Sequence, residues 1–352
     1  MANIFARKKR SAADRDFTVA ATDRDFTVVG TAAVERGAIS DIALDTDGHR
    51  IVVTNYGTNS VGVIDPGTLA HGTVATSAEP FAVAVADDRA YVAATATDSD
   101  TIMVIDIRAG QVLATYPLAF RVTAVTISPD GKRVFAGRAG LDDVDVAVID
   151  VTAERVGTID VARGPGINID AVRLDPTGNR LYVAVSDARG SRLVLLNTET
   201  ARVDGFVPIG APIRDVAVSG DGLVFVLSSD RRRGGVVHTI NPAARKVIDT
   251  AAIGGAPTQL VLSPDATRAY IVDYDGVVLF STVTNEVVDT ISVNGRPSCV
   301  AAGPDGSRLY VADHSGVVTA FSVASSMPLL YGQLTAADAI AVPQLPELEI
   351  AV

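Results

Sequence analysis

Five charged side chains interrupt short aliphatic segments and are the residues best suited to bind a polar ligand. They are Asp41, Asp170, Arg173, Arg214 and Asp215, in segments such as "SDIALD", "IDAVRLD" and "IRDVAVS", where matching segments elsewhere carry Ala, Ser or Thr. Carboxylates and guanidinium groups hold small polar molecules through charge-assisted hydrogen bonds. A carboxylate with a raised pKa also serves as an acid or base in catalysis. These five residues form our candidate ligand site.

A second set of charged residues lies in short polar loops. Arg231, Arg232 and Arg233 share one loop and suit a phosphate or carboxylate of a partner. Asp142 and Asp143 share another loop. Further loop aspartates are Asp98, Asp100, Asp187, Asp230, Asp273, Asp275 and Asp313. Aspartate in such loops most often stabilises a turn, and the alternative is an acidic ring for a cation or a basic partner.

Motifs for known cofactor or nucleophile chemistry do not occur in the sequence. There is no HExxH, CxxC, GxSxG or phosphate-loop pattern, and the four histidines lie in separate repeats. Cys299 is the one cysteine, and inside a strand it is most simply a small core residue. We therefore expect no catalytic set, no metal site and no cofactor.

The elements that position these residues repeat along the chain. Segments such as "SRLYVAD", "TRAYIVD" and "NRLYVAV" align on an aromatic or aliphatic position, which falls at 52, 91, 135, 182, 225, 270 and 310. The spacing runs from 39 residues (52 to 91) to 47 residues (135 to 182). Seven units with this period predict an all-β, seven-bladed β-propeller of four-stranded antiparallel blades.

Each unit divides into four short strands. The first ends at a turn such as "SPDG" or "DPTG", in which Pro and Gly suit a type I turn. The second contains the aligned aromatic residue, the third ends on Asp or Asn, and the fourth leads into the next unit. The first strands line the channel of a propeller, so the five candidate residues are expected at its mouth. Arg173 and Asp215 belong to neighbouring units and are expected to form a buried pair.

The domain boundaries follow from the same alignment. Residues 26–36, "FTVVGTAAVER", resemble a fourth strand that precedes the first unit, so they are expected to complete the seventh blade and close the ring. The propeller then covers residues 26–325, with blades beginning near 40, 81, 123, 170, 214, 258 and 298. We expect residues 1–25 to be a flexible basic and polar leader and residues 326–352 to be an extension, either a strand or a tail.

The units resemble the YVTN repeat family of seven-bladed β-propellers. The residues that carry the resemblance are "VVTN" at 52–55, "VID" at 63–65, "SPDGKRV" at 128–134 and "VVDTISVNGRP" at 287–297. The resemblance spans residues 26–325 and implies a bacterial propeller. Proteins of this family are known mostly as scaffolds, surface-layer or periplasmic proteins and ligand-binding propellers. Related seven-bladed propellers include sugar lactonases.

Charge and hydropathy restrict the partners and the compartment. The net charge of −11 disfavours nucleic acid, because phosphate repels an acidic protein. No stretch of 18 apolar residues occurs, so no membrane span is expected. The N-terminus lacks the apolar region of a signal peptide, which predicts a cytoplasmic protein, with export by another route still open.

Two functions fit these patterns. The first is a non-catalytic scaffold or ligand-binding module that uses the loop-rich rim and the channel mouth to bind another protein or a small polar ligand. The alternative is a lactonase-like hydrolase with its site in the mouth. Raised carboxylate pKa values in a deep polar pocket favour the enzyme. A shallow mouth with an apolar patch favours the binding module.

Overall fold

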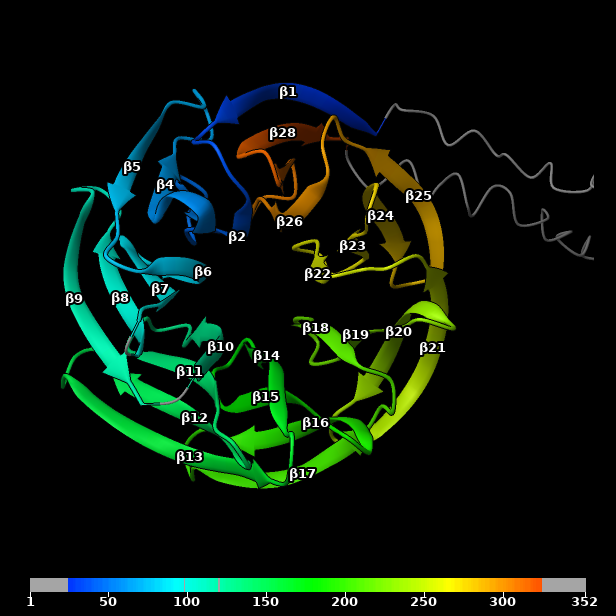
Figure 1. Cartoon of the computed structure of the whole chain (residues 1–352). Helices are drawn as coiled ribbons and strands as arrows, with labels where there is room; N and C mark the ends of the chain where they lie inside the picture. The colour runs from blue at the N-terminus through cyan, green and yellow to red at the C-terminus, as the bar shows by residue number, and fades with distance from the viewer. Residues whose placement is uncertain (1–24, 98, 120, 325–352) are drawn as a thin grey trace, which may run out of the picture.

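The fold is a ring of seven four-stranded antiparallel sheets around a central axis (Figure 1). The computed structural model describes residues 25–97, 99–119 and 121–324. Valine, isoleucine and threonine dominate the strands because their branched side chains pack well on a pleated surface. The predicted seven-bladed propeller with four strands per blade is confirmed. The only helix among the described residues is a single 3-10 turn, η1 (Tyr56–Thr58), and none has the length and hydropathy of a membrane span.

The blades follow one another along the chain, and within each blade the strands run in order from the axis outward. Blade 1 contains β2 (Ile39–Leu44), β3 (Ile51–Asn55), β4 (Ser60–Ile64) and β5 (His71–Ala75). Blade 2 contains β6 (Glu79–Ala86), β7 (Arg89–Thr95), β8 (Asp100–Asp106) and β9 (Gln111–Leu118). Blade 3 contains β10 (Arg121–Ile127), β11 (Arg133–Ala139), β12 (Asp143–Asp150) and β13 (Arg155–Arg163). Blade 4 contains β14 (Asn168–Leu174), β15 (Arg180–Asp187), β16 (Gly190–Asn197) and β17 (Arg202–Pro208).

The second half of the ring repeats this order. Blade 5 contains β18 (Ile213–Val218), β19 (Val224–Asp230), β20 (Gly234–Asn241) and β21 (Lys246–Gly254). Blade 6 contains β22 (Gln259–Leu262), β23 (Arg268–Val272), β24 (Gly276–Ser281) and β25 (Glu286–Ser292). Blade 7 takes β26 (Pro297–Ala302), β27 (Arg308–Asp313) and β28 (Val317–Val323) from the end of the chain and β1 (Phe26–Ala33) from its beginning.

Strand β1 closes the ring. It pairs antiparallel with β28, from Phe26 opposite Val323 to Ala33 opposite Val317. This confirms the predicted closing strand, although the strand ends at residue 33 and not at 36. Beyond this pairing, the Ala324 N–H donates to the Asp25 carbonyl at 2.8 Å. The predicted leader and C-terminal extension lie outside the described residues, except for Asp25.

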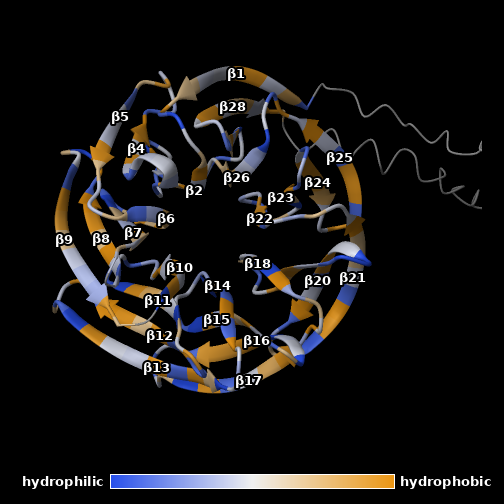
Figure 2. Cartoon of the chain, viewed as in Figure 1, coloured by the Kyte–Doolittle hydropathy of each residue, from blue (hydrophilic) through white to orange (hydrophobic). Residues whose placement is uncertain are grey.

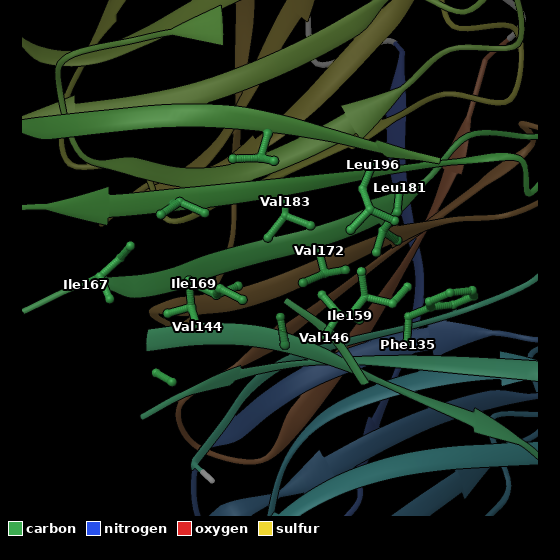
Figure 3. Packing of buried hydrophobic residues seen from close by; sticks show 14 residues of the cluster. Phe135, Val144, Val146, Ile159, Ile167, Ile169, Val172, Leu181, Val183 and Leu196 are labelled. Carbon is green, nitrogen blue, oxygen red and sulfur yellow. The ribbon is translucent and has the colours of Figure 1, made fainter. Parts of the chain in front are cut away.

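The core lies between blades, because each sheet is covered on both faces by its neighbours. Between blades 3 and 4, Val144 and Val146 meet Ile169 and Val172, and all four are almost fully buried (Figure 3). Polar and apolar residues are mixed along the outermost strands, such as β13 and β21, which lie at the rim of the ring (Figure 2). Full burial of one such aliphatic side chain contributes about 1.5–3 kcal/mol. Sideways packing of seven wedges therefore holds the ring in a rigid shape.

In six blades the turn between the first two strands has one recurring geometry, whereas blade 2 has a two-residue turn with Ala86 opposite Arg89. In blade 3 the Gly131 N–H donates to the Ser128 carbonyl at 2.8 Å, and Gly131 has a φ of 68°. Blade 6 makes the same bond from Ala266 to Ser263, also at 2.8 Å, with Ala266 at a φ of 53°. A side chain at positive φ is strained, whereas glycine is not. Ala266 is thus a strained copy of a glycine turn.

Replacing Ala266 with glycine is expected to stabilise the protein by up to about 1 kcal/mol, because relief of left-handed strain outweighs the added freedom of the unfolded chain. The free energy of unfolding in urea measures the effect. The matched control, Gly131→Ala, is expected to destabilise the protein. A loss of stability in Ala266→Gly contradicts the strain at this turn.

Candidate functional site

In six blades a β-bulge adds one residue to the innermost strand. The pairing of the first and second strands shifts register in six blades, and the unmatched residues are Ser40, Phe81, Thr123, Asp170, Arg214 and Ser298. A bulge bends the strand and redirects the side chain that it adds. Two of the five predicted ligand residues, Asp170 and Arg214, occupy this bulge position.

The bulge residues of blades 2 to 5 line an open hollow at one mouth of the channel. Its volume is about 520 Å³. Its wall also includes the beginnings of the inner strands and the loop after β3. Four of the lining residues occupy the bulge position, namely Phe81, Thr123, Asp170 and Arg214. Tyr56, Arg121 and Asn168 also line the hollow.

A short hydrogen-bond chain organises one side of this mouth. Arg121 Nη2 donates to Asn168 Oδ1 at 2.9 Å, and Asn168 Nδ2 donates to Asp170 Oδ1 at 3.0 Å. Burial raises the pKa of Asp170, while the Ser186 hydroxyl, the Asn168 amide and the charge of Arg214 oppose the rise. Arg214 itself makes no ion pair among the described residues. Its guanidinium group is therefore free to meet a ligand.

Blades 1 and 2 contribute two aromatic side chains to the mouth. Phe81 projects from β6, and Tyr56 follows β3 and is 46% exposed. Glu79, beside the Tyr56 hydroxyl, raises the pKa of that phenol through a hydrogen bond and its negative charge. The mouth thus combines cationic groups from blades 3 and 5 with aromatic side chains from blades 1 and 2.

Two other predicted ligand residues, Asp41 and Asp215, link neighbouring blades. Asp41 Oδ1 accepts the Ile42 N–H at 2.9 Å and its Oδ2 accepts the Val83 N–H of the next blade at 2.9 Å. Asp215 binds the equivalent N–H groups of Val216 at 2.8 Å and Leu260 at 3.0 Å. We call this arrangement an inter-blade bridge. Each bridge pairs N–H groups on an inner edge that has no neighbouring strand.

A third inter-blade bridge uses an amide. Gln259 has the repeat position of Asp41 and Asp215, and its Oε1 accepts the Val300 N–H of blade 7 at 2.7 Å. In blade 7 the same position is Cys299, which is buried in the core as expected. Burial raises the pKa of its thiol well above the usual range, with the charge of Asp41 adding to the rise. This position therefore serves packing between blades.

Arg173 is the fifth predicted ligand residue. It pairs with Asp215 as expected, but the pair is buried only on the Asp215 side. Arg173 Nη2 lies 3.0 Å from Asp215 Oδ1, with side chains 36% and 5% exposed. Arg173 lines a separate hollow of about 370 Å³ near the other ends of the inner strands. Desolvation raises the pKa of Asp41 to about 6, partly offset by its bond to Val83 and by the charge of Arg173. The five residues thus divide between the mouth and the channel wall.

The rim residues remain apart from the mouth. Arg231, Arg232 and Arg233 are exposed in the β19–β20 loop, where Asp230 Oδ1 accepts the N–H groups of Arg232 and Arg233 at 2.7 and 2.8 Å. Asp142 lies two blades away, just before β12, and Asp143 is the first residue of that strand. Asp98 lies outside the described residues.

Several of the other predicted loop aspartates hold a loop or join neighbouring blades. Asp100 Oδ2 accepts the Val122 N–H at 2.7 Å, Asp187 pairs with Arg192 at 2.8 Å, and Asp313 Oδ1 accepts the Val317 N–H at 3.0 Å. Within residues 25–324, apart from the two omitted positions, no group of three His, Cys, Asp or Glu side chains could hold a metal ion. An acidic hollow of about 650 Å³ contains Asp45, Asp65 and Asp88. Backbone N–H groups bind Asp45, and Arg50 and Arg108 pair with the other two.

The structure also reveals polar contacts that sequence reasoning missed. Ser228 Oγ lies 2.9 Å from His238 Nε2, and His238 Nδ1 lies 3.4 Å from Thr250 Oγ1. Ser228 has no exposed surface, and burial lowers the pKa of His238. Without access to the serine oxygen, this row serves as a hydrogen-bonded link across β19, β20 and β21. Spacing gave no signal for it, because the residues come from three strands.

The ring of seven four-stranded sheets defines the class of protein, and comparison with known proteins gives the same class. The chain belongs to the seven-bladed β-propeller proteins. It is 54% identical over 310 residues to a seven-bladed beta-propeller protein of Mycolicibacterium smegmatis, covering 88% of this chain and 84% of that protein. It is 36% identical over 290 residues to the seven-bladed beta-propeller protein Rv1057 of Mycobacterium tuberculosis, covering 72% and 74%.

More distant comparisons add only the fold. Hydrazine synthase of Kuenenia stuttgartiensis superposes with a TM-score of 0.72 at 20% identity, covering 82% of this chain and 97% of that one. No family model matches the sequence, so the resemblance to YVTN repeats rests on the repeat residues alone.

The inter-blade bridge at Asp215 is expected to be the strongest of the three. Asp215→Ala removes two backbone bonds and leaves Arg173 unpaired, which should cost about 3 kcal/mol of unfolding free energy. The matched variant Gln259→Ala removes one backbone bond and should cost about 1 kcal/mol. Urea denaturation of both variants measures the difference. A smaller loss for Asp215→Ala than for Gln259→Ala contradicts this ranking.

Asp41 is expected to make stability fall as pH rises through the weakly acidic range. Its pKa is about 6 in the folded chain against the usual 3.8 of an aspartate, so the folded state holds the proton more tightly. Its contribution is greatest below the lower value and is lost as pH approaches the upper one. The unfolding free energy of the wild type minus that of Asp41→Asn, which does not titrate, should decrease from about pH 4 to about pH 7. A constant or rising difference rules out the assignment.

Proposed function

We propose that the protein is a non-catalytic propeller that binds a small polar ligand in the mouth of its channel. The observation that carries the proposal is the open hollow of about 520 Å³ in which Arg121, Arg214 and Asp170 converge. Ligand sites in proteins typically measure about 300–1,000 Å³ and combine apolar walls with a few polar groups. The mouth has both, and it stands on the rigid inner ring.

Rigidity supports binding at this place. The polar groups project from inner strands and not from long loops, and Asn168 is bonded to both Arg121 and Asp170. Side chains that are held in place before binding lose little entropy when the ligand arrives. The exposed arginine loop at 231–233 has no comparable support, and it suits a weaker contact with an acidic protein partner.

A hydrolase that opens a cyclic ester is the second candidate, because burial raises the pKa of Asp170 beside Arg214. Asp170 would take a proton from the attacking water, and Arg214 would stabilise the negative oxygen that develops on the ester. The mouth offers no serine or cysteine nucleophile among its lining residues. Binding a polar ligand requires only some of the charged side chains in the mouth, whereas hydrolysis requires both Asp170 and Arg214 to act on the ester.

Arginine side-chain NMR spectra test the proposal. Titration with a library of small organic acids, sugars and amino acids should shift the Nε–Hε signals of Arg121 and Arg214 and leave those of Arg231, Arg232 and Arg233 unchanged. Shifts confined to the three rim arginines, or none at all, would overturn binding in the mouth. Hydrolysis of γ-butyrolactone that drops by about tenfold or more in Asp170→Asn would instead favour the enzyme.

A further inference from the structure

The charges of the mouth do not cancel. Among the residues that line the hollow, the two guanidinium groups of Arg121 and Arg214 and the one carboxylate of Asp170 leave one net positive charge. Glu79 is outside this lining and acts on the site through Tyr56. The chain as a whole carries a net charge of −11. The net positive charge of the pocket attracts an anion. The negative charge of the surrounding protein repels anions that carry more charge than the pocket can neutralise.

We propose that the ligand is an organic acid with one carboxylate and an apolar body. This inference rests on the proposed function and names the chemistry of the ligand at the same site. The carboxylate is bound by Arg121 and Arg214, and the apolar body lies against Phe81 and Tyr56.

The donors for the carboxylate are available. A guanidinium group has five N–H donors, and the hydrogen bond to Asn168 uses only Nη2 of Arg121. Arg214 makes no ion pair among the residues that the structure describes. Planar guanidinium groups match the geometry of a carboxylate better than an ammonium group does.

Asp170 limits the number of negative charges that a ligand in the mouth can carry. Asn168 holds its carboxylate on the Arg121 side, and the charge of Arg214 acts on it from the next blade. With Asp170 ionised, one ligand carboxylate makes the site neutral, whereas a second one has no cation to meet. A dicarboxylate or a doubly charged phosphate is therefore disfavoured by repulsion from Asp170.

Phe81 and Tyr56 select the rest of the molecule. Val122 and Ile213 also line the hollow, but they are the chain neighbours of Arg121 and Arg214 and are only 3% and 2% exposed. The Glu79 carboxylate, which acts on the Tyr56 hydroxyl, repels a second carboxylate. An alkyl or aromatic body gains from covering this surface, at about 25 cal/mol per Å² of apolar area.

Isothermal titration calorimetry with a matched series of small molecules tests the inference. The probes are hexanoate, the neutral hexanamide, and the dicarboxylate adipate. Hexanoate is expected to bind about tenfold or more tightly than either of the others. Arg121→Gln and Arg214→Gln should each weaken hexanoate binding by a similar factor. The matched control, Arg231→Gln on the rim, should leave it unchanged.

A charge-switch variant makes the test sharper. Asp170→Asn keeps an oxygen that can accept from Asn168 and raises the net charge of the mouth to two. Binding of adipate relative to hexanoate is expected to increase severalfold in this variant. If the ratio of adipate affinity to hexanoate affinity stays unchanged, Asp170 does not disfavour a second carboxylate, even if hexanoate binds.

The outcomes separate this inference from the function on which it rests. Equal binding of hexanoate and hexanamide, with NMR shifts at Arg214, overturns carboxylate recognition but retains a ligand site in the mouth. Adipate binding more tightly than hexanoate to the wild type overturns the single-carboxylate preference in the same way. If no small molecule shifts Arg121 or Arg214, the proposed function and this inference both fail.

Discussion

The structure depends on how the innermost strands satisfy their free edge. A blade pairs each inner strand on one side only, so its other row of N–H groups faces the axis without a partner strand. At one repeat position a polar side chain accepts an N–H of the following blade, and so pairs part of this free edge. The residues at this position are Asp41, Asp215 and Gln259. The same acceptors join neighbouring blades near the axis. Packing of the apolar sheet faces then fixes the ring, and the ring fixes the mouth.

The repeat was visible in the sequence because turn, aromatic strand and aliphatic strand recur in register, and one chance match could not produce seven aligned units. The closing strand was visible for the same reason, since residues 26–36 have the pattern of a fourth strand. Site residues were harder to predict. Asp170 and Arg214 stood out at positions where other units have small side chains. Arg121 and Asn168 lie at the start of their strands, before the region in which the units align.

The bulge explains why charge alone did not separate ligand residues from structural ones. A regular strand alternates its side chains, so Arg214 and Asp215 should face opposite ways and only one should meet the channel. The register shift adds one residue, and the structure places Arg214 in the mouth and Asp215 in an inter-blade bridge. An extra residue of this kind leaves no mark in the composition or the period. Two adjacent charged residues thus have separate roles.

The pairing of β1 with β28 has a consequence for how the protein is made. Phe26 and Val323 meet in one sheet although nearly the whole chain separates them. Contacts between such distant positions form late and slowly. During synthesis, blades 1 to 6 can assemble as their residues leave the ribosome, but the seventh waits for the last strand. Until then the nascent chain exposes two apolar sheet faces, which is the period when chaperones would matter most.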